Sequence, residues 1–67
     1  MNDREYIFTF GMGQKYENCF HAIQADNAQA ARDMMFQKFG SAWSMQYDAP
    51  NAREKAGVDR WNLKEIK

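Results

Sequence analysis

Hydrophobic and polar positions follow two different spacings along the chain, and each spacing predicts a type of element. Residues 6–10 and 19–25 are rich in aromatic and β-branched side chains, which favour β-strands. Residues 43–47 alternate apolar with polar side chains, as a strand does when one of its faces is buried. The pattern therefore predicts three strands, the first two joined as a hairpin across the glycine-containing segment 11–18.

A helical spacing follows the second predicted strand. Small and apolar residues recur on one side of it, at Ala28, Ala31, Met35 and Phe39, and polar residues occupy the other side, at Gln29, Arg32, Asp33 and Gln37. Asp26 or Asn27 can cap the first turn, and Gly40 stands where a left-handed C-terminal cap belongs. We predict a helix that ends at Gly40, with Met35 and Phe39 buried against a sheet.

The last part of the chain predicts shorter elements. A turn at residues 48–51 holds the only proline, residues 52–56 predict a short helix that stops at Gly57, and residues 61–66 predict a short closing strand. Together the elements predict one α+β domain over residues 1–67. It is a small two-layer sandwich with a ββαβ core, a short second helix and a C-terminal strand. The first strand is expected between the second and third, with the main helix over one face.

Alternation along the strands assigns side chains to the two faces of the sheet. The inner face, under the main helix, is expected to hold the larger apolar sets: Tyr6, Phe8, Phe10, Cys19, His21, Ile23, Ala25, Trp43, Met45 and Tyr47. The outer face then holds Ile7, Thr9, Phe20, Ala22, Gln24, Ser44 and Gln46. A register shift of one residue would reverse a strand, so the alternative buries Phe20 and turns His21 to solvent.

An apolar centre with a neutral polar rim is typical of a protein interface. The candidate partner-binding residues are therefore Ile7, Phe20 and Ala22 on the outer face, together with Phe36, which lies off the core stripe of the helix. We expect this surface to bind a host protein or a second copy of the chain.

Charge argues against a nucleic-acid partner, although a small nucleic-acid-binding module remains the alternative. Nine Lys and Arg residues balance nine Asp and Glu residues, whereas phosphate binding normally needs a basic excess. Aromatics on a sheet can stack on bases, but the expected outer face offers Phe20 alone and no basic residue. Apolar runs are too short to span a bilayer, and the polar N-terminus lacks a signal-peptide core. The expected location is the cytoplasm of a host cell, where a lone thiol stays reduced.

Three features were weighed as sites of chemistry, and each favours a structural role. The segment Gly11-Met12-Gly13 lacks the spacing of a phosphate loop and precedes a strand, so it predicts a turn. Cys19 and His21 share a strand face, but a buried Cys beside a hydrogen-bonded His accounts for them without catalysis. The carboxylates are scattered, and a closed zinc site needs four ligands. We therefore expect no enzyme, no catalytic residue, no cofactor and no metal.

Four blocks of the chain resemble a family of short proteins encoded by phages and prophages of Gram-positive bacteria. The blocks are Tyr6-Ile7-Phe8-Thr9-Phe10-Gly11 with Gln14, residues 17–26, Ala31-Arg32 through Met35-Phe36 to Phe39-Gly40 with Trp43 and Tyr47, and Lys55-Ala56-Gly57-Val58 with Leu63 and Ile66. The family has no assigned function, so the resemblance implies no site residue. It implies an origin in a mobile genetic element and, by association, an accessory protein that binds and inhibits a host or defence protein.

Overall fold

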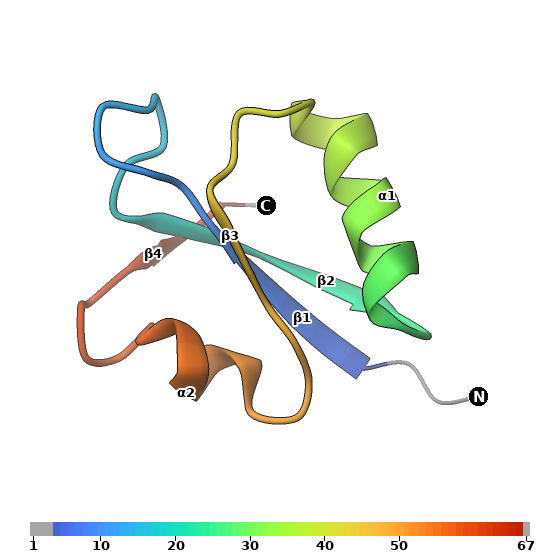
Figure 1. Cartoon of the computed structure of the whole chain (residues 1–67). Helices are drawn as coiled ribbons and strands as arrows, with labels where there is room; N and C mark the ends of the chain where they lie inside the picture. The colour runs from blue at the N-terminus through green and yellow to red at the C-terminus, as the bar shows by residue number, and fades with distance from the viewer. Residues whose placement is uncertain (1–3, 67) are drawn as a thin grey trace.

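A four-stranded mixed sheet lies at the centre of the computed structural model, in the order β3-β1-β2-β4 (Figure 1). The structure describes residues 4–66, so the polar start of the chain at residues 1–3 lies outside it. Strands β1 (Arg4–Thr9) and β2 (Cys19–Ala25) form the predicted antiparallel hairpin. Strand β3 (Met45–Tyr47) pairs antiparallel with the other side of β1, and β4 (Lys64–Glu65) pairs parallel with β2. The predicted α+β class, the central place of β1 and the closing strand are confirmed.

Helix α1 (Ala28–Phe39) has caps at both ends that the sequence predicts. The Asn27 side chain accepts a hydrogen bond from the Ala30 N–H at 2.8 Å, which satisfies a free donor of the first turn. At the other end Gly40 has a φ of 61° and donates its N–H to the Phe36 carbonyl at 2.9 Å. Met35 is fully buried against the sheet and Phe39 is half-buried, so the predicted core face of the helix is confirmed.

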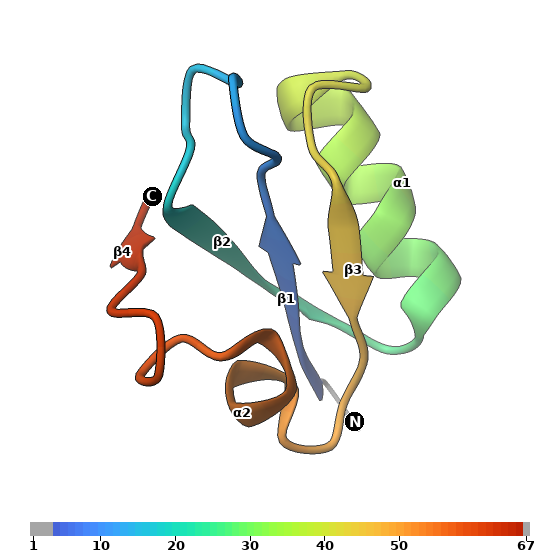
Figure 2. The same ribbon diagram turned by 60° about the vertical axis from the view of Figure 1, so that its left-hand side comes forward.

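Helix α2 (Ala52–Ala56) lies on the sheet face opposite α1 (Figure 2). It ends at Gly57, whose φ is 75° and where an added Cβ would lie 2.5 Å from the Trp61 ring, so only glycine fits. Two apolar clusters therefore exist, one on each face. The α2 cluster consists of Ile7, Phe20, Ala52, Ala56 and Val58, with Ala22, Tyr47 and Leu63 packed against it.

The prediction that Ile7 and Phe20 form an exposed outer face is wrong. Ile7 is 0% exposed, Phe20 is 3% exposed and Ala22 is half-buried, because α2 and the segment after it cover this face. β1 and β2 are central strands with both faces covered. A strand buried on both faces reads as a continuous apolar run, as residues 6–8 do.

The predicted register of β2 is confirmed, but Phe20 and His21 are both buried. His21 faces the α1 side, as predicted, and is 4% exposed. The alternative that buries Phe20 by turning His21 outward is therefore wrong, since the second apolar cluster buries Phe20 without any register shift.

The predicted faces of the third strand are wrong for all three of its residues, Met45, Gln46 and Tyr47. Tyr47 pairs with Ile7 and packs in the α2 cluster, while Met45 is 51% exposed. Gln46 instead pairs with Phe8 and donates its side-chain amide to the Ala28 carbonyl at 3.0 Å. Trp43 does lie under α1, but it precedes the strand, so strict alternation from Trp43 onward does not apply.

Candidate functional site

Three side chains form an exposed stack where α1 meets the segment that enters β3. The Arg32 guanidinium lies 5.4 Å from the ring centroids of both Phe36 and Trp43. The two rings meet edge to face with centroids 5.5 Å apart. These three residues define the α1–β3 surface: Arg32, Phe36 and Trp43.

Local structure holds this surface in place. Arg32 and Phe36 are four residues apart on α1, which places their side chains on the same helix face. The Trp43 ring packs edge to face on Phe8, with centroids 5.0 Å apart, and its indole N–H donates to the Gly40 carbonyl at 3.1 Å. The stack of Arg32, Phe36 and Trp43 is thus attached to the core in the free domain.

The α1–β3 surface has the composition of a binding site. Phe36 is 43% exposed, although it is large and apolar, and Arg32 beside it is also exposed. Aromatic residues, Met and Arg are the types enriched in protein interfaces. Within residues 4–66, Arg32 forms no salt bridge, and its neighbour Asp33 is bound instead to Gln29 at 3.0 Å. The Arg32 charge is therefore available to a partner.

A groove of about 460 Å³ runs beside this surface, between α1 and β3. Its lining comes from both elements: Ala28, Gln29, Arg32, Trp43, Ser44, Met45, Gln46 and Asp48. Gln46 spans it, because its amide donates to the Ala28 carbonyl and to the Asp48 carboxylate, each at 3.0 Å. β3 is an end strand of the sheet, so the groove lies along an unpaired strand edge.

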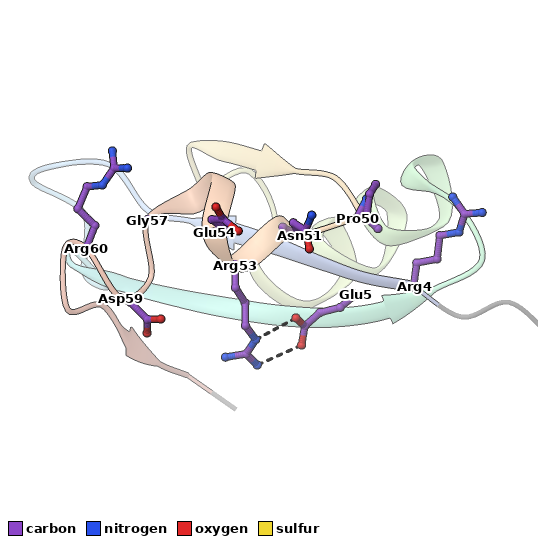
Figure 3. Close-up of a pocket in the computed structure, with 11 residues that line it drawn as sticks. Arg4, Glu5, Pro50, Asn51, Arg53, Glu54, Gly57, Asp59 and Arg60 are labelled. Atoms are coloured by element: carbon purple, nitrogen blue, oxygen red, sulfur yellow. Dashed lines mark hydrogen bonds and ion pairs between the residues drawn. The ribbon is translucent and has the colours of Figure 1, made fainter.

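A larger hollow of about 930 Å³ lies on the other side of the molecule, around α2 (Figure 3). At its centre the Arg53 guanidinium donates to both Glu5 carboxylate oxygens, at 2.9 and 3.1 Å. This hydrogen-bonded pairing raises the pKa of Arg53 above its ordinary value. Figure 3 shows Arg4 and Arg60 at opposite ends of the hollow, so its cations do not converge on one point.

The ion pair at the centre of the α2 hollow has a role in the fold. The Arg53 guanidinium also lies 5.3 Å from the Phe20 ring centroid, so the ion pair covers the apolar cluster beneath it. Glu5 comes from β1 and Arg53 from α2, which means that the pair holds α2 to the sheet.

The features weighed for chemistry have partners within the fold. The Gly13 N–H donates to the Glu17 carboxylate at 3.3 Å, so the turn binds its own side chain. The Nδ1 atom of His21 lies 2.6 Å from the Ile66 carbonyl and carries the ring proton, and Nε2 accepts from the Lys38 ammonium at 3.1 Å. His21 thus ties the C-terminal segment and α1 to β2.

Within residues 4–66, no three His, Cys, Asp or Glu side chains gather as metal ligands would. Within the same range, neither helix has the length and apolar character needed to cross a bilayer.

The structure separates the four residues predicted to bind a partner. Ile7, Phe20 and Ala22 lie in or against the α2 cluster, while Phe36 lies on the opposite side of the sheet and remains exposed. Sequence reasoning placed Arg32 on the exposed side of the helix but did not include Arg32 or Trp43 among the candidate binding residues. The i, i+4 spacing of Arg32 and Phe36, followed by a Trp just past the helix, was the available signal.

Comparison with known proteins identifies no relative: no family model, no curated protein and no solved structure matches the chain.

Proposed function

We propose that this domain is a non-enzymatic, phage-type accessory protein that acts by binding another protein through the α1–β3 surface. The host or defence protein expected from the resemblance is the kind of partner that such a module would inhibit in the cytoplasm. The observation that carries the proposal is the fixed stack of Arg32 on Phe36 and Trp43 at an exposed site.

Burial of exposed apolar side chains would provide the affinity. Fully burying a Phe side chain contributes about 1.5–3 kcal/mol, and Phe36 retains a large exposed fraction in the free domain. Trp and Arg are also the residue types most often found as interface hot spots. Phe8 and Gly40 already hold the Trp43 side chain in place, so it loses little conformational entropy on binding, which favours affinity further.

Neutral charge favours a protein partner over nucleic acid. Among residues 4–66, Arg32 is the only cation that lines the groove beside the stack, and Asp48 lines the same groove. A strand of phosphates would meet as much negative as positive charge there, and binding through phosphates needs several cations.

Affinity capture from a Gram-positive bacterial lysate tests the proposal. We expect the tagged full chain to retain a protein that the Phe36→Glu variant fails to retain. Met12→Glu is the matched control, because Met12 is 89% exposed in the β1–β2 connection and does not line the groove beside the stack. Equal capture by both variants would contradict the proposal, and so would a salt-dependent shift of single-stranded DNA or RNA that Phe36→Glu abolishes.

A further inference from the structure

We infer that a second copy of this chain binds at the α1–β3 surface, adding its own β3 antiparallel to the open edge of β3 about a two-fold axis. The inference goes beyond the proposed function, because it assigns the open edge of β3 beside the Arg32–Phe36–Trp43 stack to a second copy of the chain rather than to a host protein. Antiparallel pairing of the two β3 strands would join two four-stranded sheets into one continuous sheet.

The two edges of the sheet differ in how well they resist such pairing. β3 has the sequence Met45-Gln46-Tyr47, without the lysine or proline that commonly protects an edge. The opposite edge is β4, which has two residues, both charged and exposed. β3 is also short, with three residues, but its uncharged edge is a better template for another strand than the charged β4 edge.

The residues of β3 are complementary to themselves in an antiparallel, two-fold pairing. Centred on Gln46, this register places Met45 of each copy opposite Tyr47 of the other. Both residues pair with β1 positions on the α2 side, so an exposed apolar side chain meets a half-buried aromatic one. Cross-strand pairs of this kind stabilise a sheet.

Charge is complementary in the same register. Arg32 stacks on Trp43 at the start of β3, and Asp48 follows Tyr47 at its end. Antiparallel pairing brings the Arg32 end of one copy to the Asp48 end of the other, and the two-fold axis repeats the contact. Within residues 4–66 neither side chain forms a salt bridge, because the Asp48 carboxylate accepts from the neutral Gln46 amide.

The opposite orientation is disfavoured for the same reason. A parallel pairing of the two open β3 edges would turn one copy over, so its α1 would lie on the opposite face of the joined sheet and the Arg32–Asp48 contacts would be lost. The chain has a formal net charge of zero, so two copies do not repel each other at long range. Apolar pairing and charge thus favour one arrangement.

Charge reversal tests the arrangement by sedimentation velocity on the full chain, from micromolar concentrations up to about 1 mM. We expect a concentration-dependent dimer. R32D and D48R should each weaken it about tenfold or more, because each places like charges together at two symmetric positions. The double variant R32D/D48R restores opposite charges and should recover the dimer.

R60D is the matched control, because Arg60 lines the α2 hollow and its reversal should leave the dimer intact. Circular dichroism verifies that each variant is folded. A monomer throughout the concentration range overturns the inference, as does a dimer insensitive to both single reversals or one that the double reversal fails to restore. A monomer whose capture of a different protein still depends on Phe36 leaves the proposed function standing.

Discussion

The two faces of the sheet are covered by helices of very different construction. On one face, α1 has twelve residues, a side-chain N-cap from Asn27 and a glycine C-cap. On the other, α2 has five residues, and Asn51 before it has a left-handed φ of 61° and makes no capping hydrogen bond. Helices this short are not stable alone, so α2 owes its structure to packing.

This difference separates local from long-range stabilisation. The first turn of α1 is capped by a residue three positions away. The Arg53–Glu5 pair that holds α2 joins residues separated by 48 positions in the chain. Substitutions on the two faces should therefore disturb the fold in different ways, and the effects can be ordered from largest to smallest.

The largest effect is expected for Phe20→Glu. Phe20 is 3% exposed beneath α2, and an unpaired carboxylate buried there would cost several kcal/mol. We expect circular dichroism at room temperature to show that the variant is unfolded. The control Phe36→Glu adds the same charge at a 43% exposed position and should remain folded. A folded Phe20→Glu variant would mean that α2 does not cover this face.

Met35→Ala tests the α1 face. Met35 is fully buried, so its truncation should reduce the free energy of unfolding by about 2–5 kcal/mol, measured by urea denaturation. Met34→Ala is the control on the same helix, since Met34 is 38% exposed and should change stability much less. Equal losses for the two variants would contradict the packing of α1 on the sheet.

The caps of the two helices should differ in importance. Asn27→Ala removes the acceptor for the Ala30 N–H and should cost about 1 kcal/mol of stability. Asn51→Gly removes no capping bond and keeps the left-handed backbone accessible, so its thermal midpoint should change little. A larger loss of stability for the Asn51 variant than for the Asn27 variant would show that the residue at the N-terminus of α2 does stabilise this helix.

The smallest effect is expected for Arg53→Gln, at most about 1 kcal/mol and less at high salt, because the ion pair is partly solvated. Folding raises the pKa of Arg53, so the charged side chain stabilises the fold. This stabilisation is complete at any pH below the pKa of the unfolded state, and it is lost as the pH rises through the pKa of the folded state. The Arg53 contribution should therefore be constant across neutral pH. The difference in denaturation midpoint between the wild type and Arg53→Gln should be the same at pH 6 as at pH 8.

Sequence reasoning was most successful where neighbouring residues determine the structure. The β1–β2 hairpin, the limits of α1 and the end of α2 at Gly57 follow from strand-forming runs, caps and a glycine with positive φ. For the candidate site, it identified Phe36 as a residue off the core stripe but placed it with the wrong neighbours. Phe36 meets Trp43 only because the chain turns back along α1 after Gly40.

The sequence by itself determined the α+β class, the order of the elements and the core side of α1, because caps, turns and periodicity act over a few residues. Only the tertiary structure decided that α2 covers Ile7 and Phe20, and that Tyr47 and Gln46 face opposite sides of the sheet. These outcomes depend on contacts between segments far apart in the chain. An apolar residue shows the same pattern in the sequence whether a distant helix covers it or a partner does.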